Sequence, residues 1–220
     1  MAFPWTKPSK RKGQPLLNCL RSPTFRNLNP RVAVAVARYL EVPGEFVRAS
    51  PRDLKNQDDF RRINPNAPVP ALTEENRTPW DMDAIACRLA MLADSAFWLT
   101  GDPVPEFQVW VSWSTHHLTR AANRFYGEYV IKPMIGLRSA SESGLDAAIV
   151  DFHRFVSALD DASSDRTWLI GNKPGFAEFR ATTEMPFAEV SRVPPQEDKN
   201  IKRWCDRFWQ FPAWSYPFAD

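Results

Sequence analysis

The chain has 220 residues, of which 44% are hydrophobic and 25% are charged, and its formal net charge is +2. This composition is that of an ordinary globular protein, and the length allows one large domain or two smaller ones. The small net charge argues against a nucleic-acid partner, and no run of about 18 apolar residues indicates a membrane span.

The chain begins with a basic tail, residues 1–13, which we expect to be a solvated, disordered arm. The first 30 residues contain no continuous apolar stretch, so we expect no signal peptide. Cys19, Cys87 and Cys205 are odd in number and widely spaced, which predicts reduced thiols in a cytoplasmic protein. Cys19 falls inside a predicted strand, where we interpret it as a small buried hydrophobe.

The first half of the chain alternates strand-like and helix-like segments. Asn29 is a predicted N-cap with Pro30 at the first helical position. In order, we predict a strand at 15–20, a helix at 30–41, a strand at 45–49, a helix at 51–63, a hairpin of 69–72 with 78–80, and a helix at 81–93. This βαβαββα order predicts a parallel, right-handed βαβ unit followed by an antiparallel hairpin.

Strand signals almost vanish after the segment TGDPVPE, residues 100–106. The clearest helix there carries an apolar stripe at the 3–4 spacing of a buried face, made of Leu145, Ile149, Phe152, Val156 and Leu159. The predicted helices of this half span 104–131, 144–160, 176–190 and 197–209. The pattern therefore predicts an α/β half followed by an all-helical half.

The segments INPNAPVPAL (63–72) and TPWDMDAIACRLA (78–90) together resemble the core signature of cytosolic, bacterial-type glutathione S-transferases. WLIGNKPGFAEF (168–179) and RWCDRFWQFPAW (203–214) are similar to later segments of the same family. The similarity runs in order and spacing over about residues 14–216.

The resemblance implies a thioredoxin-like, glutathione-binding domain at 14–96, a linker at 97–103 and an all-helical substrate and dimer domain at 104–220. It also implies a detoxification enzyme of the cytoplasm, working as a homodimer. Such an enzyme adds or exchanges the glutathione thiolate on a small apolar electrophile. An alternative within the same fold is a weakly active or inactive interaction module.

The same resemblance assigns the glutathione-binding residues. Pro70 would be a cis-proline at the end of the third strand, leaving the backbone of Val69 free to pair with the cysteinyl unit. The helix N-terminus at Asp81–Met82 would bind the γ-glutamyl carboxylate, and Asp81 its ammonium group. The alternative is an edge strand followed by a helix that Asp81 merely caps.

A donor to the glutathione sulfur is expected in the loop 21–31, since such a donor lowers the thiol pKa. Ser22 is the closest match to the family motif. The loop is longer than usual in the family, however, so Thr24 and Asn27 stay open as alternatives.

Two departures from the family pattern predict weaker glutathione binding. Met82 stands where a serine hydroxyl is expected. Gly175 and Glu178 stand where the family has a Ser or Thr N-cap and an Asp three residues after it.

Two other groups of residues are candidates for a functional site. Trp110, Trp113, His117 and Arg120 lie at 3–4 spacing and form either a substrate pocket or a packed helix seam. The adjacent His116 and His117 diverge on a helix, so we predict no metal site.

Overall fold

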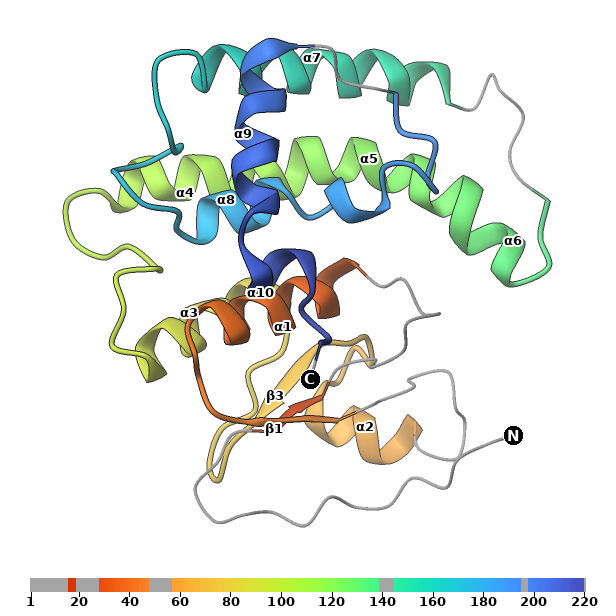
Figure 1. Cartoon of the computed structure of the whole chain (residues 1–220). Coiled ribbons are helices and arrows are strands. Elements are labelled where there is room, and N and C mark those ends of the chain that lie inside the picture. Colours follow the sequence, from red (N-terminus) through yellow and green to blue (C-terminus); the bar gives the residue numbers. More distant parts are fainter. Residues whose placement is uncertain (1–15, 19–27, 48–56, 139–144, 195–197, 220) are drawn as a thin grey trace. The chain divides into compact units, whose positions relative to one another are not determined.

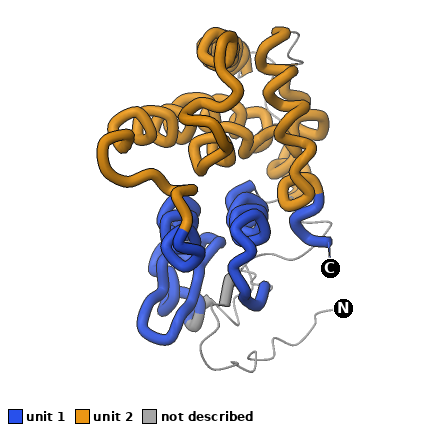
Figure 2. The backbone as a smooth tube through the Cα atoms, turned by 60° about the vertical axis from the view of Figure 1, so that its left-hand side comes forward, with its two compact units in different colours: residues 1–94, 216–220 blue, residues 95–215 orange. Residues whose placement is uncertain are grey.

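The computed structural model describes residues 16–18, 28–47, 57–138, 145–194 and 198–219 (Figure 1). The chain forms two compact units: residues 1–94 with 216–220, and residues 95–215 (Figure 2). The C-terminal residues thus return to the first unit, where Arg38 Nη2 donates to the Ala219 carbonyl at 3.2 Å. No described helix is long and apolar enough to cross a membrane.

The first unit contains a three-stranded sheet of order β2-β1-β3, built from β1 (Leu16–Asn18), β2 (Glu45–Val47) and β3 (Ala71–Thr73). β1 pairs with β2 in parallel, as the sequence predicts, and with β3 antiparallel. The helices are α1 (Leu28–Tyr39), α2 (Gln57–Ile63) and α3 (Met82–Leu92). α1 packs against α3 through fully buried aliphatic side chains, among them Val32, Val36, Ile85 and Leu89.

Two details of the first unit differ from the prediction. α1 begins at Leu28, so Asn29 lies inside the helix and is not its N-cap. The second strand of the hairpin is reduced to one antiparallel bridge, Ala71 with Trp80. Leu72 N donates to the Pro79 carbonyl at 2.8 Å, but Pro79 has no N–H to extend the ladder.

The second unit is helical and begins with one continuous stretch from 104 to 134. It runs through α4 (Val104–Trp113), the π-helical Ser114–Leu118, α5 (Thr119–Tyr126), the π-helical Gly127–Ile131 and α6 (Lys132–Met134). The predicted helix at 104–131 is therefore confirmed, with two π-helical interruptions that the sequence pattern did not indicate. Arg180 Nε donates to Thr115 Oγ1 at 2.7 Å and thereby ties the first π segment to a later helix.

The remaining helices are α7 (Asp146–Ala162), α8 (Phe176–Ala181), a 3₁₀ turn (Met185–Phe187), α9 (Lys199–Trp209) and α10 (Pro212–Ser215). The predicted helix at 176–190 is wrong beyond Ala181. The hydroxyl groups of Thr182 and Thr183 donate back to the carbonyls of Glu178 and Arg180, at 2.8 and 2.7 Å, where the helix ends. Of the predicted stripe on α7, Ile149 is partly exposed and the other members are buried.

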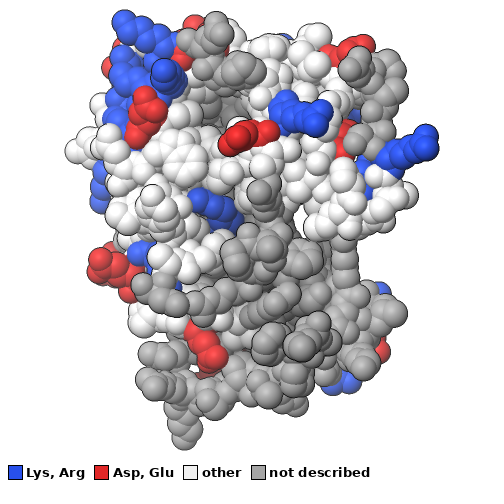
Figure 3. Space-filling model, turned by 45° about the vertical axis from the view of Figure 1, so that its right-hand side comes forward, with Lys and Arg blue, Asp and Glu red and all other residues white. Residues whose placement is uncertain are grey.

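Aromatic rings form much of the core of the second unit. Phe208 lies 4.9 Å from Phe179 and 4.8 Å from Trp214 between ring centroids, in edge-to-face geometry. All three side chains are fully buried. On the surface, Figure 3 shows charged side chains of both signs among uncharged ones, with one gathering of Lys and Arg at upper left.

Candidate functional site

The loop before β3 is organised by one buried side chain, that of Asn64. Its Nδ2 donates to the Pro68 carbonyl at 2.6 Å, and its Oδ1 accepts from Asn66 N at 3.0 Å. Its backbone carbonyl accepts from Ala67 N at 2.8 Å, where Ala67 takes a positive φ of 65°. Asn64 therefore fixes the path of the chain into Val69.

The peptide bond between Val69 and Pro70 is cis, as the resemblance predicts. β3 begins only at Ala71, so Pro70 precedes the strand and does not end it. The Val69 side chain is buried against Phe60 and Ala71. Among the described residues, nothing forms a hydrogen bond with the N–H or C=O of Val69.

Asp81 caps α3 in an unusual backbone conformation, with φ 72° and ψ 143°. Its Oδ1 accepts from Asp83 N at 3.1 Å, and its carbonyl accepts from Ile85 N at 3.0 Å. Within the described part of the chain, the N–H of Met82 has no hydrogen-bond partner. A positive φ in a residue other than glycine is costly and concentrates at functional positions.

The bridge between Ala71 and Trp80 brings these two features to the same end of the hairpin. Since Ala71 is paired with Trp80, the preceding Pro70 and the following Asp81 lie at neighbouring positions on adjacent strands. Arg88 holds the far end of the hairpin on α3, because its Nε and Nη2 donate to the two Glu74 oxygens at 2.7 and 2.8 Å. This hydrogen-bonded pairing lowers the pKa of Glu74.

Asn64→Ala is expected to lower the free energy of unfolding by about 2 kcal/mol, since the Pro68 carbonyl and Asn66 N–H lose their partner. Urea denaturation measures the change. Asn66→Ala is the matched control, because that side chain is exposed and should contribute less than about 0.5 kcal/mol. Equal effects of the two substitutions would contradict the anchoring role of Asn64.

The predicted thiol-activating residues, Ser22, Thr24 and Asn27, lie outside the described residues, as does Cys19. The described chain resumes at α1, whose first turn carries a buried arginine, Arg31. Burial lowers the pKa of Arg31 to about 10. Sequence reasoning missed this residue, because an arginine after Asn-Pro looks like an ordinary exposed position of a first helical turn.

The four candidate residues of the substrate pocket differ in their packing and exposure. Trp110 packs on Trp113 at 5.5 Å between centroids, and Trp113 and His117 both pack on Phe155 of α7, at 6.0 and 5.1 Å. Trp113 and His117 therefore lie where two helices of the second unit pack together, whereas the ring contact of Trp110 is with Trp113 of its own helix. Arg120 is exposed and lines a polar cavity of about 330 Å³ together with His116, His117, Arg124 and Arg154.

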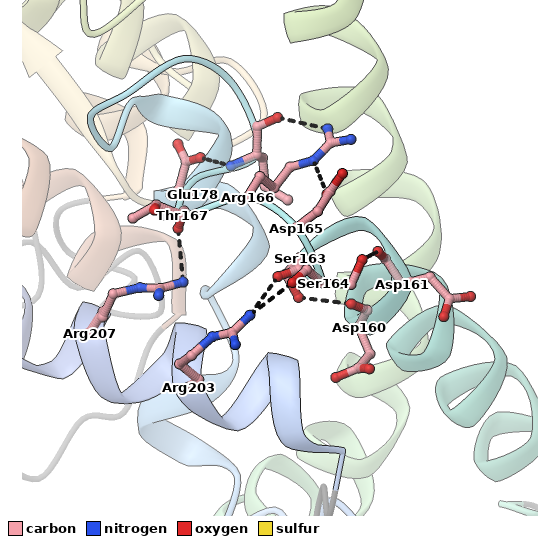
Figure 4. Close-up of polar contacts among 11 residues, drawn as sticks. Asp160, Asp161, Ser163, Ser164, Asp165, Arg166, Thr167, Glu178, Arg203 and Arg207 are labelled. Carbon is pink, nitrogen blue, oxygen red and sulfur yellow. Dashed lines mark hydrogen bonds and ion pairs between the residues drawn. The ribbon is translucent and has the colours of Figure 1, made fainter.

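Glu178 joins α8 to the loop before it. Its Oε1 accepts from Leu169 N at 2.7 Å (Figure 4). Its Oε2 accepts from Gly175 N at 2.8 Å. Gly175 has no side chain to complete the reciprocal cap, so half of the box is present, as predicted. A Cβ at Gly175 would lie 3.2 Å from the Phe97 carbonyl oxygen, which leaves little room for a larger residue.

The same loop is held from α9. Arg203 donates to the carbonyls of Ser163 and Ser164, and Arg207 to that of Thr167, at 3.0–3.2 Å (Figure 4). These bonds attach α9 to the segment that leads from α7 to α8. Among the described residues, no group of three or more His, Cys, Asp or Glu is placed to hold a metal ion.

Comparison with known proteins identifies the fold. No protein-family model and no curated protein sequence matches the chain. Among solved structures, glutathione S-transferase III in its apo form matches at 16% identity and TM-score 0.79, covering 93% of this chain and 95% of that one.

Two further structures hold glutathione. The theta class glutathione S-transferase of the citrus canker pathogen Xanthomonas axonopodis pv. citri, with glutathione bound, matches at 17% identity and TM-score 0.78 over 94% of this chain and 98% of that one. Ure2p in complex with glutathione matches at 16% identity and TM-score 0.79 over 96% of each chain. The chain therefore has the predicted fold, a thioredoxin-like N-terminal domain followed by a helical C-terminal domain.

Proposed function

We propose that the protein binds glutathione and transfers its thiolate to a small apolar electrophile. The observation that carries the proposal is the pair of main-chain groups at Val69 and Met82 that have no partner among the described residues, held at one end of the hairpin by the Ala71–Trp80 bridge. Two of the structures with this fold hold glutathione. Membership of the bacterial-type branch of the family stays a prediction.

The cysteinyl and γ-glutamyl units of the tripeptide each have a counterpart in the proposed site. The cysteinyl main chain would exchange hydrogen bonds with Val69, as an added strand does at a sheet edge. The γ-glutamyl carboxylate would lie at the N-terminus of α3, where free N–H groups and the helix dipole favour an anion. Asp81, which extends from the same turn, would pair with the neighbouring ammonium group.

The chemistry would start from the thiolate. A donor among Ser22, Thr24 and Asn27 would stabilise it, so that the thiol proton passes to solvent near neutral pH. The sulfur electron pair then forms the new bond to the electrophile, and the leaving group departs with its own bonding pair.

In this proposal residues 14–96 bind glutathione and 104–220 supply the electrophile pocket, with Trp110, Trp113, His117 and Arg120 as its candidates. The linker is 97–103, and the protein acts as a cytoplasmic homodimer.

Asp81→Asn is expected to weaken glutathione binding about tenfold or more, because a charge-assisted hydrogen bond to the ammonium contributes about 1.5–3 kcal/mol. Asparagine is also a good N-cap, so the fold should be retained. Isothermal titration calorimetry with glutathione measures the change.

Asp83→Asn is the matched control, being the same substitution in the same helical turn. It should change the affinity much less, since Asp83 follows the cap and is not predicted to contact the ligand. Equal loss in both variants would indicate a general charge effect and not a contact with Asp81. If the unmodified protein does not bind glutathione at millimolar concentration, the proposed function is wrong.

The alternative function is a binding module of the same fold without turnover. The observation that favours it is Met82, whose side chain is 1% exposed and presents no hydroxyl group to a carboxylate. Retention on glutathione resin, followed by an assay with a chloro-dinitro-aromatic substrate, separates the two. Retention without turnover supports the module, and retention with turnover supports the enzyme.

A further inference from the structure

A second cavity lies inside the helical unit and has no part in the proposed glutathione site. It measures about 310 Å³ and is bounded by α5, α7 and α9 (Figure 1) and by the segment 181–194. Its walls are mostly aliphatic and aromatic, with Leu118, Phe152, Val156, Ile201 and Trp204 among them. An engineered apolar cavity of about 150 Å³ binds benzene, so this one has room for a body of about two rings.

Glu184 is the polar side chain buried in this cavity wall. It is 9% exposed, and its Oε1 is buried and has no hydrogen-bond partner among the residues that the structure describes. Burial raises the pKa of Glu184 to about 8, although the charge of Arg180 acts in the opposite direction. A buried carboxyl group without a partner is costly, and such a group is normally paired or bound.

The other polar groups of the lining indicate which ligand charge the cavity would accept. Glu189 also lines it but is exposed, so an acidic group stands where the cavity reaches the surface. The Cys205 thiol is neutral, since burial and the nearby Asp206 raise its pKa to about 12. No Lys, Arg or His is among the lining residues, which all belong to the described chain. Arg180, the nearby cation, directs its Nε to Thr115.

A second buried polar atom of the lining also has no partner, namely the indole Nε1 of Trp204. The Trp204 Nε1 atom is shielded from a water-sized probe, so the polar group that these apolar walls offer to a ligand is the Glu184 carboxyl group. This is the usual character of a small-molecule site, in which a few polar groups orient an apolar ligand.

We propose that this cavity binds a compact apolar amine, with the protonated nitrogen paired to the Glu184 carboxylate and the hydrocarbon body against α5, α7 and α9. On binding, Glu184 gives up its proton to solvent, and the ligand cation replaces it. A cation beside the Glu184 carboxyl group favours its ionised form, so binding of the cation and release of the proton are thermodynamically linked. The site lies wholly in the second unit and does not depend on glutathione binding.

The test compares 1-naphthylmethylamine with the neutral 1-naphthalenemethanol, which has nearly the same shape. Isothermal titration calorimetry of the whole protein at pH 7 should give at least tenfold tighter binding of the amine. Titrations in buffers of different ionisation enthalpy should show that about one proton is released with the amine and none with the alcohol. This proton count uses the unmodified protein, so it does not depend on how well a variant folds.

Glu184→Gln should abolish both the preference for the amine and the proton release, while the alcohol binds as before. Asp161→Asn is the control, because Asp161 is exposed on α7 and is not part of the lining; it should change the affinity for the amine by about twofold at most, as for a solvent-exposed charge. Equal binding of amine and alcohol, or an unchanged preference in Glu184→Gln, would overturn the proposal. Failure of both compounds to bind would overturn it as well, whatever the result with glutathione.

Discussion

Glu178→Ala is expected to lower the free energy of unfolding by about 3 kcal/mol. The Glu178 carboxylate accepts hydrogen bonds from the N–H groups of Leu169 and Gly175, and its side chain is 1% exposed. Alanine would leave both donors without an acceptor, and an unpaired buried donor costs about 1–3 kcal/mol. The loss of the buried charge offsets part of this cost.

Urea denaturation followed by circular dichroism measures this change. Glu189→Ala is the control, since Glu189 is exposed and its removal should alter the stability by less than about 0.5 kcal/mol. If Glu178→Ala is as mild as the control, then the two hydrogen bonds that Glu178 accepts do not hold the loop 163–175 on α8.

The same residue should make the stability depend on pH. Desolvation raises the pKa of Glu178 to about 7, and the hydrogen bonds from backbone N–H groups offset only part of this shift. Between about pH 4.5 and 7 the folded protein therefore holds a proton that the unfolded chain has lost. Stability should fall as the pH rises through this range, and Glu184, with its pKa raised to about 8, acts in the same direction.

Glu178→Gln cannot ionise, so its stability should change less between pH 5 and 7 than that of the unmodified protein. Its overall stability should also be lower, because the amide nitrogen cannot accept one of the two hydrogen bonds. The contradicting result would be an unmodified protein that is more stable at pH 8 than at pH 5, together with the same change of stability with pH in Glu178→Gln. That result would show that Glu178 is ionised over the whole range.

Among Ser22→Ala, Thr24→Ala and Asn27→Ala, one substitution is expected to reduce kcat/KM about 100-fold. The loss of a single donor to a developing or stabilised anion typically costs this much or more. In that variant the pKa of bound glutathione should return toward 8.5, the value of a free thiol. Thiolate absorbance in the ultraviolet measures it directly.

The two other variants serve as controls in the same loop and should keep both the low thiol pKa and most of the turnover. The affinity for glutathione should stay nearly constant in all three, since the γ-glutamyl and main-chain contacts lie elsewhere. If all three variants keep the low thiol pKa, the helix N-terminus and main chain alone lower it, and the assignment to this loop is wrong.

The order of the elements could be predicted from sequence because most of them carry periodic apolar positions. The element ends that were predicted wrongly depend on polar contacts, which the spacing of apolar residues does not reveal. Thr182 and Thr183 bond back to the helix and end α8 early, and Pro79 limits the second hairpin strand to a single bridge. The π-helical segments in 104–134 likewise leave the apolar pattern almost unchanged.

The candidate site was predictable where a local motif specifies the backbone, as at Val69–Pro70 and Asp81. Asn64 and Glu184 were not identified, because a single polar residue shows its role only when its burial and partners are known. Asn64 offered a weak signal, since it begins the Asn-Pro-Asn turn before the strand. Trp110 and Trp113 show the same limit, since aromatic residues at helical spacing occur both in pockets and where helices pack together, so the sequence leaves both roles open.

The hairpin bridge at Ala71 and Trp80 also bears on how a binding site made of main-chain groups persists through evolution. Amide and carbonyl groups are supplied by nearly every residue type, so the ligand contacts proposed at Val69 and Met82 survive replacement of their side chains. Mutations accumulate around such a site while its peptide groups stay in register. Searches that score amino-acid identity therefore lose such a site long before its backbone geometry changes.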